Sequence, residues 1–242
     1  MSSSIVSKIC YLALIISTYF LQKSFAADPL GYSCINPQNF SSHSSYELDL
    51  NKLTGLIDYL TQPTGYAQAS VGQAYGLGLC RGDVSSFDCL ACISEASIQT
   101  RKLCPANKGA VIWYDYCMFK YLDQNFLGRI DESVVIYLSN IHNVTNNQLF
   151  KKKNNELLSK LSKEAAISPK RYANGEIVVD GNTTIYGLAQ CTRDLSSYEC
   201  NKCLNDQITK RLPNCCEGKE GGRVLSGSCN VKYEIYPFVK GV

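Results

Sequence analysis

The chain has 242 residues, and its 24 lysines and arginines against 21 aspartates and glutamates give a formal net charge of only +3. This near balance of positive and negative charges argues against a strongly basic surface that binds nucleic acid or membranes. Thirteen cysteines point instead to a protein that folds in an oxidising compartment.

The first 26 residues have the pattern of an export signal. Lys8 precedes an apolar run over residues 9–21, and small residues follow up to Ala26 and Ala27. This run is short for a membrane span, which needs about 20 residues, so we expect cleavage after Ala26 rather than a signal anchor. No other stretch has the length and hydropathy of a span, and we expect a secreted, extracellular protein.

The next elements in the chain belong to a first helix-and-strand unit. An apolar face at helical spacing predicts a helix over residues 50–60. Ser85 followed by Asp88 has the spacing of a helix N-cap, so a second helix is expected to begin there. A β-rich run predicts a strand over residues 111–116. The apolar face of the first helix comprises Leu50, Leu53, Leu56, Ile57 and Leu60.

A second unit repeats this order. Its first helix carries apolar residues over residues 149–161, with the basic run 151–153 interpreted as a solvated face rather than a phosphate-binding patch. Ser196 and Glu199 repeat the N-cap spacing. Strands are predicted over residues 134–138, 176–179 and 231–236. The apolar residues of the helix are Leu149, Phe150, Leu157, Leu158 and Leu161.

An internal repeat explains this similarity. Four cysteines of the first unit recur 111 residues later, and the sequence of residues 74–93 aligns with that of residues 185–204. We therefore predict an α+β protein with two tandem domains, residues 28–125 and 131–242, each with two helices packed on an antiparallel sheet. The short connection between the domains favours close packing.

Loss of Cys10 with the signal leaves twelve cysteines, an even number that allows all of them to form disulfides. Zinc binding by the CxxC pairs, Cys89 with Cys92 and Cys200 with Cys203, is the less favoured alternative in an exported chain. We expect no metal ion and no cofactor. Three Asn-x-Ser/Thr sequons are expected glycosylation sites, at Asn39, Asn143 and Asn182.

The spacing C-x8-C-x2-C-x11-C-x12-C over residues 80–117 resembles that of the plant ginkbilobin-homologous domain, also called the stress-antifungal domain. Two such domains behind an export signal are similar to a plant cysteine-rich repeat secretory protein. The ending LPNCCEGKEGGRVLSGSCNVKYEIYPF also resembles the second domain of plant cysteine-rich receptor-like kinases. The resemblance covers essentially all of the mature chain and implies a defence-related binding protein of the plant apoplast.

The resemblance also implies a disulfide pairing, which the sequence alone leaves open among 15 connectivities for six cysteines. No cysteine matches Cys34 in the second domain, and Cys215 and Cys216 are adjacent. We predict a vicinal disulfide for this pair, with free thiols or a bridge to another chain as alternatives. The implied pairs are Cys34 with Cys104, Cys80 with Cys89, Cys92 with Cys117, Cys191 with Cys200, and Cys203 with Cys229.

Family resemblance further implies a carbohydrate site. A mannose-binding lectin of this family uses an asparagine, an arginine and a glutamate, and the matching positions in the second domain are Asn143, Arg223 and Glu234. Such groups suit vicinal hydroxyls, which both donate and accept hydrogen bonds. Two observations oppose this hypothesis: Arg223 and Glu234 can instead form a cross-strand ion pair, and a glycan on Asn143 would occupy the site.

The first domain lacks this trio, because its matching residues Ile35, Val111 and Leu122 are apolar. Two hypotheses follow. One is a carbohydrate-binding defence protein with affinity for mannose-type glycans. The other is a protein-interaction module that recognises extracellular receptor domains and has lost sugar binding.

Catalysis is not expected. The mature chain has only two histidines, His43 and His142, and no G-x-S-x-G motif, so a nucleophile with its base is not evident. The carboxylate pairs Asp131/Glu132 and Glu217/Glu220 are interpreted as solvated charges rather than a glycosidase pair.

Overall fold

The computed structural model describes residues 28–35 and 38–239. The predicted export signal lies outside the described residues. Within this part of the chain, none of the helices combines the length and hydropathy of a transmembrane span.

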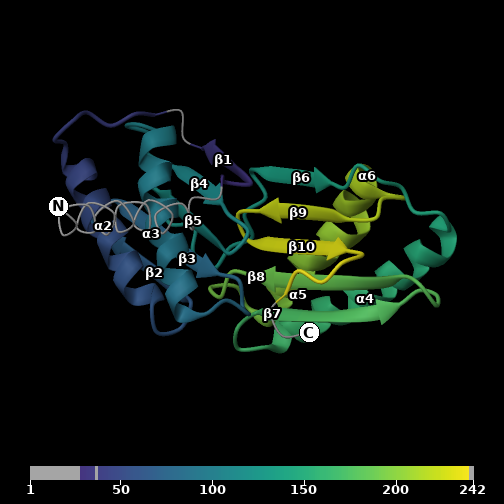
Figure 1. Cartoon of the computed structure of the whole chain (residues 1–242). Helices are drawn as coiled ribbons and strands as arrows, with labels where there is room; N and C mark the ends of the chain where they lie inside the picture. Colours follow the sequence, from purple (N-terminus) through teal and green to yellow (C-terminus); the bar gives the residue numbers. More distant parts are fainter. Residues whose placement is uncertain (1–27, 36–37, 240–242) are drawn as a thin grey trace, which may run out of the picture.

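The first domain is a five-stranded antiparallel sheet with two helices (Figure 1). The strand order is β1-β4-β5-β3-β2. In chain order the elements are β1 (Gly31–Cys34), α2 (Ser45–Thr61), β2 (Tyr66–Val71), β3 (Ala74–Cys80), α3 (Ser86–Leu103), β4 (Ala110–Trp113) and β5 (Cys117–Leu122).

The second domain repeats this topology, with strand order β6-β9-β10-β8-β7. The repeated order confirms the α+β class and the duplication. Its elements are β6 (Val135–Ser139), α4 (Asn147–Ile167), β7 (Tyr172–Val178), β8 (Thr184–Cys191), α5 (Ser197–Asp206), the π-helix η1 (Gln207–Arg211), α6 (Leu212–Cys216), β9 (Gly222–Ser226) and β10 (Cys229–Glu234).

Helices α3 and α5 begin where the sequence predicts. The Ser85 hydroxyl accepts a hydrogen bond from the Asp88 amide at 3.1 Å, and Ser196 does the same for Glu199 at 3.2 Å. The Glu199 carboxylate in turn accepts from the Ser196 amide at 3.0 Å, which completes a capping box. Each cap satisfies amides that the first helical turn leaves without partners.

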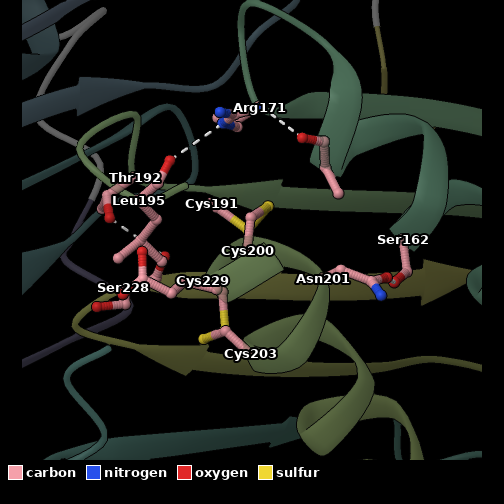
Figure 2. The surroundings of a disulfide bond; sticks show 12 residues. Ser162, Arg171, Cys191, Thr192, Leu195, Cys200, Asn201, Cys203, Ser228 and Cys229 are labelled. Carbon is pink, nitrogen blue, oxygen red and sulfur yellow. Dashed lines mark hydrogen bonds between the residues drawn. A yellow bond between two sulfur atoms is a disulfide. The ribbon is translucent and has the colours of Figure 1, made fainter. Parts of the chain in front are cut away.

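The structure joins the cysteines in the pairs that the resemblance implies. On α5, Cys200 reaches back to Cys191 in β8 and Cys203 reaches across to Cys229 in β10 (Figure 2). Helix α5 is thereby fixed to two central strands of its sheet. The other disulfides are Cys34–Cys104, Cys80–Cys89, Cys92–Cys117 and the vicinal pair Cys215–Cys216.

The apolar face of α2 is narrower than the sequence predicts. Leu50, Leu53 and Ile57 are fully buried against the sheet, whereas Leu56 and Leu60 are 37% and 38% exposed. Helical spacing alone assigned all five residues to the core. Only the first three point at the strands, because the buried side of an α-helix covers a limited arc.

The strand boundaries also differ from expectation. The strand predicted over residues 134–138 is β6 at residues 135–139, and the one predicted over 231–236 is β10, which begins two residues earlier and ends at Glu234. The predicted strand over residues 111–116 ends at Trp113, because the chain turns through residues 114–116 into β5. The predicted strand over residues 176–179 is the end of a longer strand that begins at Tyr172. The basic run on α4 lies on its polar side, where Lys151 pairs with Glu217 and Lys153 with Glu156.

The two domains pack through the sheet faces that their helices leave uncovered. Leu77, Leu79, Val111, Trp113 and Met118 of the first domain form one buried cluster with Leu225 of the second. Polar contacts border this cluster: the Trp113 indole donates to the Ser226 carbonyl at 3.1 Å, and the Gln190 amide donates to the Cys80 carbonyl at 2.9 Å. The domains therefore share a core, as the short connection favours.

The Cys34–Cys104 disulfide should stabilise the first domain more than any shorter crosslink. Its cysteines are 70 residues apart in sequence, whereas Cys80 and Cys89 are nine apart. On chain entropy, removing the first by a double substitution to alanine should cost about 4 kcal/mol and removing the second about 2.7 kcal/mol. Denaturant unfolding of both variants measures this order, and a larger loss for the short loop would contradict it.

Candidate functional site

Arg223 lies on β9, on the sheet face that meets the first domain, and is only 5% exposed. Its guanidinium donates to the Asp115 carboxylate of the first domain at 2.6 Å and to the Asn230 side-chain oxygen at 3.1 Å. The arginine is therefore engaged between the domains rather than directed towards solvent.

Asp115 is the centre of a charge cluster that spans both domains. Besides Arg223 at 2.6 Å, its carboxylate lies 2.9 Å from Arg81 of its own domain and 3.7 Å from Lys232 of the second domain. Arg81 also pairs with Asp83 at 2.6 Å. A single partly exposed carboxylate thus pairs with cations of both domains.

The cluster determines the protonation of Asp115. Burial alone would raise the pKa of its carboxyl, but the positive charges of Arg223, Lys232 and Arg81 outweigh burial and hold the pKa below its usual value. Burial lowers the pKa of Arg223, and the charge of Asp115 opposes that effect. The acid is therefore ionised and the arginine is charged at neutral pH.

Glu234 lies at the end of β10, on the same sheet face as Arg223. No ion pair joins these two side chains among the described residues, so the expected cross-strand pair is replaced by the Arg223–Asp115 pair. Burial raises the pKa of Glu234, while Lys232 and the hydrogen-bonding groups of Asn140 and Tyr236 counteract it.

Asn143 is not beside Glu234. It is exposed and forms an isolated bridge with Lys219. The residue whose amide meets the Glu234 carboxylate is Asn140, at 3.5 Å. Strand register explains the shift: Leu138 pairs with Arg223 as Ser33 pairs with Val111, so Asn140 is the structural match of Ile35.

Asn143 instead matches Asn39, which bridges Asn107 in the first domain. The sequons at Asn39, Asn143 and Asn182 all have exposed asparagines. In the first domain, Ile35 and Val111 pack within the interdomain cluster. The position of Arg223 in the repeat is therefore part of the domain contact in both halves.

The space beside Arg223 is small. A recess lined by Trp113, Asp115 and Arg223 has a volume of about 30 Å³, far below the roughly 300 Å³ at which small-molecule pockets begin. A space of this volume fits a water molecule but not a sugar ring. Asn143, Arg223 and Glu234 are thus not brought together around a ligand-sized cavity.

The residues considered for catalysis are mostly engaged elsewhere. Asp131 pairs with Lys120, a lysine with no exposed side-chain surface, and Glu132 pairs with Arg211 at 2.9 Å. Both histidines are exposed, and neither imidazole makes a hydrogen bond in the described part of the chain. Among the described residues, no cluster of three metal-binding side chains occurs.

Sequence reasoning missed the residues that matter most here, Asp115, Arg81 and Lys120. Lys120 lies on β5, on the face that the helices leave uncovered, Asp115 lies in the turn between β4 and β5, and Arg81 directly follows β3. Their common signal is a charged side chain within or beside a β-rich run. That signal is weak, because charged residues are equally common on solvated strands.

Comparison with known proteins gives consistent results. The sequence model of a family described as salt stress response/antifungal matches residues 33–124 and 138–236. An antimicrobial ginkbilobin-2-like protein of Castanea crenata is 44% identical over 243 residues, which cover 99% of both chains. Cysteine-rich repeat secretory protein 38 of Arabidopsis thaliana is 47% identical over 84% of this chain and 82% of that protein.

A solved structure has the same architecture. The tandem DUF26 ectodomain of the Arabidopsis thaliana cysteine-rich receptor-like protein PDLP5 superimposes with a TM-score of 0.73 and 28% identity, covering 87% of this chain and 100% of the ectodomain. Tandem domains of this family therefore occur in both secretory and receptor-like proteins.

Replacing Asp115 by asparagine should weaken the domain contact. We expect a loss of about 1–2 kcal/mol in the free energy of unfolding at neutral pH, less than for a fully buried pair because 42% of the Asp115 side chain is exposed. Since the folded pKa is lowered from 3.8, the contribution is present above that pH and is lost as the pH falls through the lowered pKa.

Urea unfolding of the wild type and of Asp115→Asn, from neutral pH downward, measures this difference. Glu164→Gln is the matched control, because its exposed carboxylate pairs with exposed Lys160 at 3.9 Å and should contribute under about 0.5 kcal/mol. A stability difference between wild type and Asp115→Asn that stayed constant into strong acid would contradict the role of the ionised carboxylate.

Proposed function

Because this chain belongs to the salt stress response/antifungal domain family, we propose that it is a secreted, non-enzymatic protein of the plant apoplast that serves defence by recognising extracellular protein partners. Its two domains share a buried cluster and present their outer surfaces as one body. The relatives named above include an antimicrobial protein and a receptor-like ectodomain.

The observation that carries this proposal is an exposed apolar surface on α2. Leu56, Tyr59 and Leu60 lie side by side in the helix, and Tyr59 is 69% exposed. Apolar and aromatic side chains that are not needed for the core are enriched at protein interfaces. They are suited to bind a partner.

The second domain supplies the comparison. Leu53 of α2 and Leu157 of α4 contact the matching glycines Gly76 and Gly187, which aligns the two helices. On this alignment Leu56, Tyr59 and Leu60 correspond to exposed Lys160, Lys163 and Glu164. Because the same fold accommodates charges at these positions, the three apolar residues of α2 are not required for folding.

Transplanting the charges tests the proposal. The triple variant Leu56→Lys, Tyr59→Lys, Leu60→Glu should keep its stability within about 0.5 kcal/mol per exposed substitution. It should also lose the protein partners that the oxidised wild type captures from extracellular fluid, as measured by quantitative mass spectrometry. Lys163→Ala on α4 is the control and should capture them. Equal capture by the triple variant would contradict the role of α2.

A second candidate function is the binding of a mannose-type glycan. Asn140, Glu234 and Tyr236 place an amide, a carboxylate and a half-exposed phenol near one another at the end of β10. Such groups can bind the hydroxyls of a mannose-type glycan without Arg223. This candidate needs only a shallow site at the surface.

Calorimetric titration with mannose separates the two candidates. If the chain recognises protein partners alone, the wild type should give no saturable heat with mannose. Saturable binding that is lost in Glu234→Gln and kept in Asn143→Gln would support the sugar candidate, with Asn140 and Glu234 as its residues.

A further inference from the structure

A second cavity lies at the junction of the two domains, separate from the recess at Arg223. Its volume is about 290 Å³, close to the lower limit of ligand pockets. The first domain contributes the turn over residues 63–65 and Ser86 in the first turn of α3. The second domain contributes Lys170 and Arg193.

The charges around this cavity are unbalanced. Its lining contains Arg81, Lys170 and Arg193 but no aspartate or glutamate. Arg81 is matched by Asp83 and Asp115. No carboxylate of the described residues lies within ion-pair distance of the other two cations, so two positive charges face the cavity without a counter-charge.

Arg193 is the less satisfied of these two cations. Its guanidinium lies 5.7 Å from the centre of the Tyr66 ring, and its Nε is buried without a hydrogen-bond partner. Burial lowers the pKa of Arg193, as expected for a cation that has lost water without gaining an acid. A buried N–H group that lacks an acceptor is costly, and an anion that accepted from Nε would remove that cost.

Among the described residues, Lys170 donates from its ammonium group to a neutral acceptor. Its Nζ donates to the Gly82 carbonyl at 3.1 Å across the domain boundary, which leaves two of its three donor hydrogens for other partners. The start of α3 adds the partial positive charge of a helix N-terminus. The donors available at the cavity are thus all suited to oxygen anions.

The repeat shows that the domain contact does not require an arginine at the position of Arg193. Gly82 occupies the position of Arg193 in the first domain, and Tyr172 packs on it much as Tyr66 packs beside Arg193. Strand register identifies the two tyrosines as equivalents, since Tyr66 pairs with Leu79 and Tyr172 with Gln190. At the equivalent place in the domain contact, a glycine is therefore enough for the tyrosine to pack.

We propose that this interdomain cavity is a binding site for a small oxyanion, a sulfate, phosphate or carboxylate group, held by Arg193 and Lys170. Arg193 supplies a planar pair of donors and Lys170 a point charge. The cavity accommodates the anionic group together with part of a sugar ring, so a uronate or a sulfated sugar fits as well as the free ion. The site is distinct from the exposed surface of α2.

The test is calorimetric titration of the oxidised mature chain with sodium sulfate and with sodium galacturonate, at ionic strength held constant with sodium chloride. We expect saturable binding by the wild type. Arg193→Gln and Lys170→Gln should each weaken it about tenfold, the loss of one charged hydrogen bond. Lys160→Gln, which removes an exposed cation of α4 paired with Glu164, should bind like the wild type.

Arg193→Lys separates the charge of this residue from its packing on Tyr66. If Arg193 binds an anion, the lysine variant should retain most of the affinity, whereas Arg193→Gln should not. Saturation by sulfate alone would assign the ligand to tetrahedral anions, and saturation by galacturonate alone to acidic sugars. Saturation by neither, or unchanged affinity in both glutamine variants, would overturn the proposal.

Discussion

The carboxylate of Asp115 is held between Arg81 of its own domain and Arg223 of the other, with Lys232 close by. Buried cations need a nearby acid, because the cost of removing them from water is otherwise not recovered. One acid in the turn after β4 therefore constrains two sheets at once. Since Arg223 meets this requirement, it is not available to a sugar.

The charge cluster and the disulfides have different tasks. Within each domain, two disulfides hold the helix α3 or α5 to the central strands. No disulfide links the two domains among the described residues, so their relative position depends on the Asp115 charge cluster together with the buried apolar cluster and its polar border. The duplicated domains thereby form one two-domain unit whose surfaces differ. Helix α2 exposes apolar side chains, and the cavity near Arg193 is lined by positively charged side chains.

Much of the fold could be predicted from the sequence because its signals are local. Ser85 and Ser196 fix the starts of α3 and α5 through hydrogen bonds to residues three positions further along the chain. The repeated cysteine spacing identifies equivalent positions in the two domains. Helical periodicity found the helices but misplaced Leu56 and Leu60, since spacing does not say where the neighbouring sheet ends. The missing match to Cys34 left the register of β6 without an anchor. Sequence alignment therefore places Asn143 at the position equivalent to Ile35, where strand pairing places Asn140.

The role of Arg223 could not be predicted in the same way. Its partner Asp115 is 108 residues away in sequence and belongs to the other domain. A matched motif position predicts the residue type, but its chemical role depends on which groups the tertiary structure brings near it. The same holds for Arg193, whose significance comes from the lack of an ion-paired carboxylate among the described residues.

A double-mutant cycle between Asp115 and Arg223 tests the central claim most directly. The free energies of unfolding are measured for the wild type, Asp115→Asn, Arg223→Met and the double variant. We predict a coupling energy of about 1–2 kcal/mol, as expected for two charges in direct contact across the domain boundary. Additivity within about 0.3–0.5 kcal/mol would contradict the claim that this ion pair joins the domains.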